Sequence, residues 1–193
     1  MKRRNFILLA LVTLVGFSGG GLLVIYYFND TPMVRILTGG FSFPMQVFIG
    51  IIYGIITGWT AKTIVESDFL QPVRAHYAKL MSPLELSNFD IILISLCAGI
   101  GEELFFRAGI QPLLGLWPTS ILFVALHGYL NPMNLRLSLY GMAMTVIIAG
   151  MGVLFLQTGI VTAIVAHAVI DVILLKMIDT MPEDVPAEDR DNY

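Results

Sequence analysis

Two adjacent glutamates and an arginine interrupt a hydrophobic stretch near the middle of the sequence. The segment GEELFFRAG occupies residues 101–109. Each charged side chain costs about 2.5–3.5 kcal/mol at the centre of a membrane-spanning helix, so such residues usually serve a function. A glutamate can take a proton from water, while a histidine or a metal ion can polarise a carbonyl group. The segment therefore predicts a polar, chemically active site inside an apolar protein.

Further ionisable residues lie well inside other apolar stretches. With the residues of the first segment they form a set from three segments, namely Glu102, Glu103, Arg107, His127, His167 and Asp171. At about 1.5 Å per residue, Glu102, His127 and His167 all fall near the middle of the membrane. Such residues rarely face lipid, so we expect them to converge on a shared interior.

The spacing within the first segment predicts that its two glutamates have different partners. Glu103 and Arg107 are four residues apart, so they can pair on one helix face and reduce each other's burial cost. Glu102 is rotated by about 100° from Glu103 and should meet a different neighbour.

The histidines have helical partners of their own. His167 and Asp171 are four residues apart on one face. Phe123 stands one turn before His127 and can pack on its imidazole ring. A structural polar network is the alternative, but six such residues favour a functional site.

The composition is that of an integral membrane protein. The chain has 193 residues, of which 56% are hydrophobic and 13% charged, with a mean hydropathy of +0.81. Soluble domains contain about 25% charged residues. We predict an all-α, polytopic transmembrane bundle with six spans at about 5–28, 43–65, 89–115, 117–130, 138–157 and 159–178. The fourth span is short and is expected to end at the turn sequence NPMN, residues 131–134.

The remaining segments complete a single transmembrane domain over residues 1–178. The N-terminal stretch is predicted to be an uncleaved helix rather than a signal peptide. Apolar residues at helical spacing within residues 66–88 predict a short amphipathic helix on the cytoplasmic surface. Residues 179–193 hold six of the fourteen acidic residues and are predicted to form a disordered cytoplasmic tail.

Glycines recur every four residues in the first two spans. They are Gly16 and Gly20 in the first span, and Gly50, Gly54 and Gly58 in the second. This spacing predicts close packing against neighbouring helices.

Basic residues predict the orientation. All but two fall on the side of the N-terminus, namely Lys2, Arg3, Arg4, Lys62, Arg74, Lys79, Arg136, Lys176 and Arg190. Arg35 falls on the opposite side, and Arg107 lies inside a span. Because Lys and Arg are enriched on the cytoplasmic side, both termini are expected in the cytoplasm.

Three motifs resemble those of a known family. EELFFR (102–107) resembles the EExxxR motif of the CPBP family of intramembrane proteases, which includes CAAX prenyl endopeptidases and bacteriocin-processing proteases. FVALH (123–127) is similar to the FxxxH motif, and HAVID (167–171) to the Hxxx(N/D) motif of that family. The resemblance covers about residues 85–175.

The resemblance implies hydrolysis of a peptide bond in a membrane cavity. Glu102 would activate water with His127 as its partner, and Glu103 and Arg107 would brace the site. His167 and Asp171 would hold the oxyanion or the second side of the water. Many family members have Asn in place of Asp171, and an ionised Asp cannot donate to an oxyanion. Asp171 would therefore be protonated, orient His167 or bind a cation.

The sequence leaves alternatives for the metal requirement, the partners and the function. Glu102, His127, His167 and Asp171 are compatible with zinc, and a metal-free glutamate mechanism is the equal alternative. The expected partners are the lipid bilayer and a peptide or protein substrate, membrane-associated or prenylated, with no nucleic acid. The short chain resembles the bacterial type, which implies a bacterial plasma membrane. The alternatives are a non-catalytic scaffold or bacteriocin-immunity protein, and a proton-coupled transporter.

Overall fold

The computed structural model describes the backbone of residues 2–179, and the side chains of these residues except 76, 77, 80, 82 and 179. Within this range the chain is helical and has no strand, which confirms the predicted all-α class. The elements are α1 (Arg3–Phe28), α2 (Met33–Thr38), α3 (Phe43–Val65), η1 (Asp68–Leu70), α4 (Gln71–Met81), η2 (Ser82–Leu84), α5 (Asn88–Glu103), the π-helix η3 (Leu104–Ile110), α6 (Gln111–Leu114), α7 (Leu116–Leu126), α8 (Leu135–Thr158) and α9 (Ile160–Asp179).

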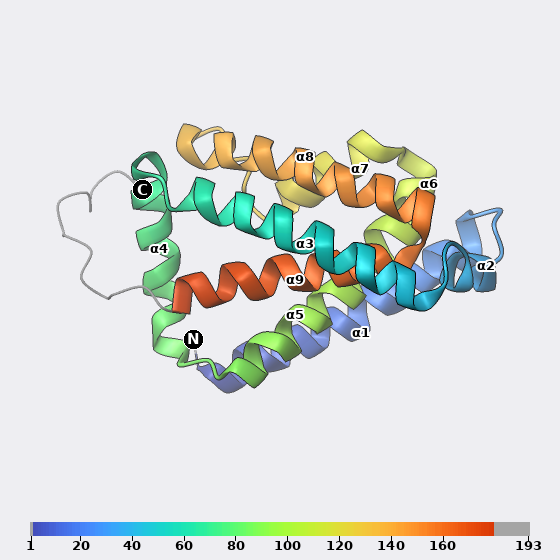
Figure 1. Cartoon of the computed structure of the whole chain (residues 1–193), viewed down its shortest axis with the longest axis horizontal. Coiled ribbons are helices and arrows are strands. Elements are labelled where there is room, and N and C mark those ends of the chain that lie inside the picture. Colours follow the sequence, from blue (N-terminus) through green and yellow to red (C-terminus); the bar gives the residue numbers. More distant parts are fainter. Residues whose placement is uncertain (1, 180–193) are drawn as a thin grey trace.

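Four helices are long and apolar enough to cross a membrane by themselves, namely α1, α3, α8 and α9. They correspond to the first, second, fifth and sixth predicted spans. The third predicted span is a composite, because α5, η3 and α6 follow one another without a break. The short helix predicted between residues 66 and 88 is present as α4. The protein is an integral membrane protein with a helical bundle (Figure 1).

The fourth predicted span is wrong in extent, because α7 ends at Leu126 rather than near residue 130. Gly128 adopts a left-handed conformation with φ of 77°. The Gly128 N–H donates to the Ala125 carbonyl at 2.9 Å, and the Tyr129 N–H donates to the Val124 carbonyl at 3.2 Å. These two bonds form a Schellman motif, which closes a helix at a C′ glycine. The stop signal is therefore Gly128, and NPMN lies beyond it.

The early end of α7 leaves irregular backbone at membrane depth. The helix has 11 residues and covers about 16 Å. Its antiparallel neighbour α8 has 24 residues and covers about 36 Å. Residues 127–134 connect the two helices, and the first part of this loop lies beside α8 rather than at its end, because the Tyr129 carbonyl approaches Gly141. Non-helical backbone is tolerated at that depth only where protein buries it or where it lines a water-filled cavity.

Helix α9 is the central element, since it packs against α3, α5 and α8 (Figure 1). The predicted close packing of Gly50, Gly54 and Gly58 is confirmed against this helix. A Cβ atom added at Gly54 would lie 2.7 Å from Val169 Cβ and 2.8 Å from the Ala166 carbonyl oxygen. These glycines let the α3 backbone reach α9, which carries His167 and Asp171.

The predicted close packing is wrong for Gly16 and Gly20 of α1. No atom of the described residues lies within 4 Å of a Cβ added at Gly16, so that glycine makes no close helix contact. A Cβ at Gly20 would make only ordinary contact with the Phe105 ring. The close approach occurs at Gly21, where a Cβ would lie 2.5 Å from the Leu104 carbonyl oxygen. Helix α1 thus packs directly on the start of the π-helix.

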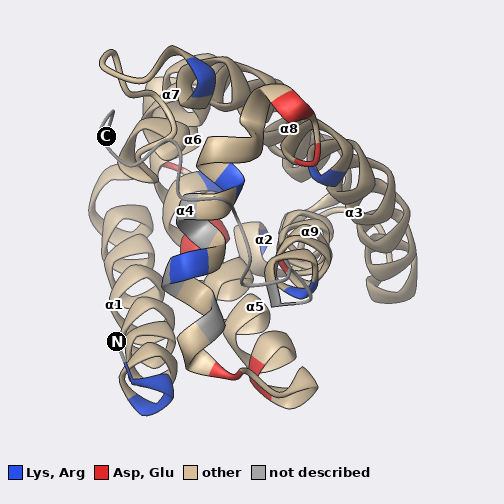
Figure 2. Cartoon of the chain, turned by 90° about the vertical axis from the view of Figure 1, so that its left-hand side faces the viewer, with Lys and Arg blue, Asp and Glu red and all other residues tan. Residues whose placement is uncertain are grey.

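The basic residues gather at one end of the bundle. The start of α1, the end of α3, all of α4, the start of α8 and the end of α9 meet at this end, which faces the viewer in Figure 2. Arg3 of α1 also forms an ion pair with Asp90 of α5 there, at 2.7 Å. Helix α2, with Arg35, lies at the opposite end (Figure 1). The acidic tail predicted for residues 179–193 lies outside the described residues from position 180 onward.

The glycine contacts predict opposite effects for two alanine substitutions. Gly54→Ala should destabilise the protein by about 1–3 kcal/mol, because the methyl group overlaps the α9 backbone. Gly16→Ala should stabilise it by about 0.5–1 kcal/mol, since alanine favours the helix and meets no neighbour. Thermal unfolding of both variants in the same detergent checks this, and equal effects at the two positions would contradict the packing described.

Candidate active site

The two adjacent glutamates stand where α5 changes into the π-helix η3. The π-register is visible at its end, where the Gln111 N–H donates to the Phe106 carbonyl, five residues earlier. Short π-helical turns occur frequently at functional sites. Arg107 lies within this turn, so the segment EELFFR spans the change of helical register.

Glu103 is the centre of a buried charge network. Its Oε2 accepts a bond from Arg107 Nε at 3.1 Å, and its Oε1 accepts one from His167 Nδ1 at 2.8 Å. The side chains of Glu103 and Arg107 have no solvent exposure, and that of His167 is 7% exposed. The pairing of Glu103 with Arg107 is as predicted. The bond to His167 was not predicted, and it joins the end of α5 to α9.

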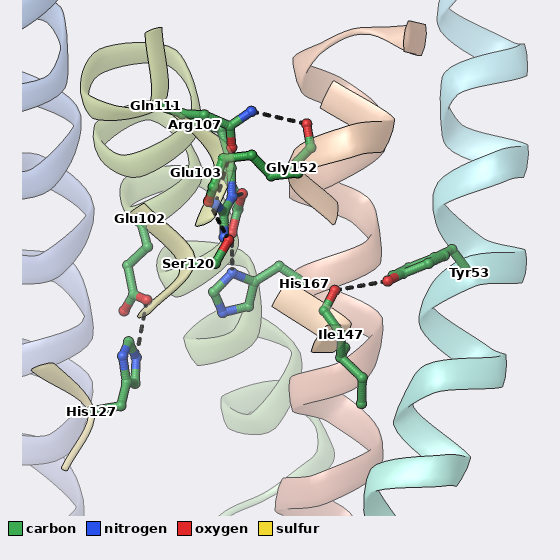
Figure 3. A network of polar contacts seen from close by, with 11 residues as sticks. Tyr53, Glu102, Glu103, Arg107, Gln111, Ser120, His127, Ile147, Gly152 and His167 are labelled. Carbon is green, nitrogen blue, oxygen red and sulfur yellow. Dashed lines mark hydrogen bonds and ion pairs between the residues drawn. The ribbon is translucent and has the colours of Figure 1, made fainter. Parts of the chain in front are cut away.

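The network continues beyond Arg107 to a residue that sequence reasoning missed. Arg107 Nη1 donates to Gln111 Oε1 at 3.2 Å, and Gln111 Nε2 donates to the Gly152 carbonyl of α8 at 3.0 Å (Figure 3). Arg107 Nη2 is buried and has no hydrogen-bond partner among the described residues. The available signal was an amide within an apolar segment, four residues after the arginine.

Asp171 lies on the other side of the His167 ring. Its Oδ2 is 3.5 Å from His167 Nε2, and its side chain is 28% exposed. Both ring nitrogens of His167 therefore face a carboxylate. Of the three roles considered for Asp171, this contact favours orientation of His167.

Glu102 and His127 form a second, separate pair (Figure 3). His127 Nδ1 lies 2.8 Å from the Phe123 carbonyl oxygen. Because a carbonyl only accepts, Nδ1 must carry a hydrogen, and Nε2 then faces Glu102 Oε2 at 3.2 Å.

One atom of this second pair lacks a hydrogen-bond partner among the described residues. The contact between Nε2 and Oε2 lacks the alignment of a hydrogen bond, and the buried Oε2 atom has no hydrogen-bond partner among residues 2–179. Catalytic hydrogen bonds are often poorly aligned before substrate binds. The open acceptor is available to a water molecule or to a substrate.

Phe123 holds the two sets together. Its ring stacks on His127 with centroids 4.3 Å apart, as predicted, and meets the edge of His167 at 5.7 Å. The Schellman motif places His127 at the C-cap of α7, so it lies at a helix end rather than inside a span. The FVALH segment thus positions both histidines.

Solvent exposure separates the six residues into two groups. Glu102, His127 and Asp171 are 12%, 32% and 28% exposed, whereas Glu103 and Arg107 are fully buried and His167 is 7% exposed. The first group is accessible from outside the protein, and the second is not. All six predicted residues converge on one cluster. In this cluster Glu102 and His127 are partly exposed, and Glu103 and Arg107 are buried.

The arrangement does not fit a zinc site. Within the described residues, no group of three or more His, Cys, Asp or Glu side chains is placed to hold a metal ion. Glu103 and a main-chain carbonyl hold the Nδ1 atoms of His167 and His127, so only the Nε2 atoms of these histidines could ligate a metal ion. A structural zinc site needs four ligands around one point and a catalytic site needs three.

Comparison with known protein families identifies a family that the chain resembles. The model of type II CAAX prenyl endopeptidase Rce1-like proteins matches residues 85–173. This match supports the assignment of the chain to the CAAX protease family. No curated protein and no solved structure gives a match. The matched segment begins just before α5 and ends within α9, so it contains all six candidate residues.

At family level, this assignment supports an intramembrane endopeptidase of the CAAX protease type. The helices that precede the match, α1 to α4, supply contacts rather than motif residues. Helix α3 supports α9, and α1 supports the π-helix. The CAAX protease motifs therefore rest on a scaffold from the N-terminal half.

The contrast between the two glutamates predicts different costs for the same substitution. Glu103→Gln should destabilise the protein by about 3–5 kcal/mol, because it leaves the Arg107 charge buried without its partner. Glu102→Gln should change stability by less than about 1 kcal/mol, since Glu102 is partly exposed and has no arginine partner. Thermal unfolding in detergent compares the two, and equal losses would contradict the division described.

Proposed function

We propose that the protein cleaves peptide bonds with a water molecule activated by Glu102 and His127, without a metal ion. The observation that carries this proposal is the separation of the adjacent glutamates. Glu103 has both oxygens occupied by Arg107 and His167, while Glu102 Oε2 has no hydrogen-bond partner among the described residues. Only Glu102 retains an acceptor for the proton of water.

In the proposed reaction, Glu102 takes one proton from water as the oxygen attacks the carbonyl carbon of the substrate. His127 Nε2, 3.2 Å away, shares that proton with the carboxylate. The tetrahedral intermediate then collapses as the proton passes to the leaving nitrogen and the C–N bond breaks. The first products are a carboxylic acid and an amine, which become a carboxylate and an ammonium group when the acid proton passes to the amine. The Glu102–His127 pair returns to its starting proton count.

His167 is the proposed donor to the oxyanion. Its Nδ1 is held by Glu103, so the ring cannot rotate without losing a charge-assisted bond at 2.8 Å. Its Nε2 faces the partly exposed side, where Asp171 lies 3.5 Å away. An oriented N–H in a water-poor site stabilises the developing negative charge on the carbonyl oxygen.

The proposed substrate is a peptide or protein segment that enters from the membrane or its surface, as the family name implies for prenylated chains. The loop 127–134 supports water access, because it is irregular backbone that is not buried by protein, and such backbone at membrane depth lines a water-filled cavity. The basic residues at the end shown in Figure 2 support cytoplasmic termini. The proposal of a bacterial plasma membrane rests on the resemblance to the bacterial type.

Substitution of the proposed base tests the mechanism. Glu102→Gln should lower kcat about 100- to 10,000-fold, because an amide cannot accept the proton of water. His127→Gln should also lower kcat strongly, with KM changed much less. The measurement is cleavage of a quenched fluorescent peptide library by the purified protein in detergent, with products identified by mass spectrometry.

Glu66→Gln is the matched control, since Glu66 lies beyond the end of α3 and pairs with Lys62 on the surface. It should retain the parent rate. A Glu102→Gln variant as active as the parent would overturn the proposal. Absence of cleavage by the parent would favour the scaffold or transporter functions considered from the sequence.

Removal of metal ions gives a separate prediction. The parent protein should keep its rate after dialysis against a strong chelator, because the described side chains do not provide a three-ligand site. The rate is measured before and after dialysis, and again after addition of zinc. Loss of activity that zinc restores would show that the site rearranges around a metal ion.

A further inference from the structure

Gln111 occupies a position that the proposed chemistry does not yet use. It lies at the start of α6 and is 3% exposed. Its side-chain orientation is unambiguous, because Arg107 only donates and the Gly152 carbonyl only accepts. Gln111 must therefore present its oxygen to Arg107 and its nitrogen to α8.

This amide is one of only two acceptors that hold the buried guanidinium. Among the described residues, Arg107 donates to Glu103 and to Gln111, and Nη2 has no partner. Without Gln111, Nη1 would also lose its partner, and both terminal nitrogens would be unpaired in a fully buried position. Unsatisfied buried donors are costly, so the guanidinium would shift to find another acceptor.

The close fit at Gly152 is a second, independent observation. A Cβ atom added there would lie 2.5 Å from Gln111 Oε1 and 2.5 Å from Leu116 Cδ1. The absence of a side chain at residue 152 thus makes the space that the amide fills.

A continuous series of hydrogen bonds connects this point to the reactive face. It runs from the Gly152 carbonyl through Gln111, Arg107 and Glu103 to the Nδ1 atom of His167 (Figure 3). Each member is buried, and the series joins α8, α6, η3, α5 and α9. The position of the His167 ring therefore depends on the hydrogen bonds at the far end of this series.

We infer that Gln111 is a positioning residue for the proposed reaction. It anchors Arg107 to the α8 main chain, and through Arg107 and Glu103 it sets the placement of the His167 ring. The inference rests on the proposed function for its catalytic consequence. Its structural part, the placement of His167, stands independently of any activity.

Gln111→Met tests the inference, since methionine has a similar length but neither accepts from Arg107 nor donates to Gly152. We expect kcat to fall about 10- to 100-fold with KM within about twofold, because small displacements of a catalytic group cost this much. The imidazole ¹⁵N signals of histidine-labelled protein report the placement of His167 directly. The chain has three histidines, so His76→Gln and His127→Gln assign the spectrum.

Gln46→Met is the matched control. Gln46 is 4% exposed and likewise links elements, because it donates to the Phe41 carbonyl at 2.7 Å and accepts from the Val161 N–H at 3.1 Å. It does not contact Arg107. This variant should lower the melting temperature and leave both kcat per folded molecule and the His167 signal unchanged.

Gly152→Ala is the second variant, since its methyl group displaces Gln111 without removing the amide. It should move the His167 signal in the same direction as Gln111→Met. An unchanged His167 signal in both variants, or an unchanged kcat in an active protein, would overturn the inference. If the parent shows no Glu102-dependent cleavage, the proposed function fails, and the His167 signal alone decides the positioning role.

Discussion

Glu103 and Arg107 place two opposite full charges in the interior with no solvent exposure. An isolated ion in such surroundings loses several kcal/mol of solvation even after relaxation, and the attraction between the two offsets this only in good geometry. The pair therefore persists only if every neighbouring element stays in place. Helix α1 presses on the π-helix at Gly21, and α9 supplies His167 as a further donor. The packing of α1 and α9 around α5 and the π-helix keeps this pair satisfied.

The adjacency of the two glutamates has a mechanistic meaning in this arrangement. Consecutive residues on a helix point in directions about 100° apart, so one segment can serve two environments. Glu103 enters the buried network and loses its free acceptors. Glu102 turns toward His127, which is 32% exposed at the end of α7, and keeps an acceptor open. Glu103 therefore stabilises the structure, whereas Glu102 takes part in the reaction in the proposed function.

The sequence was sufficient to predict the helical membrane class, the six converging residues and the Glu103–Arg107 pair, because these depend on periodicity and on the cost of charge in lipid. It was not sufficient for features that depend on local register or on tertiary partners. The π-turn after Glu103 has no clear composition signature. The end of α7 at Gly128 was obscured by a more obvious turn sequence a few residues later. The bond from His167 to Glu103 joins residues 64 positions apart, so no spacing rule could predict it.

The early end of α7 also has a consequence for the surrounding lipid. On most sides the bilayer meets helices about 30 Å or more in length, whereas beside α7 the apolar wall is only about 16 Å tall. Such hydrophobic mismatch is relieved when acyl chains shorten or tilt, at fractions of a kcal/mol per Å. The membrane should therefore be thinner on this flank than elsewhere around the protein. A peptide approaching from that side would leave the hydrocarbon phase before it reached His127, with its backbone already partly hydrated.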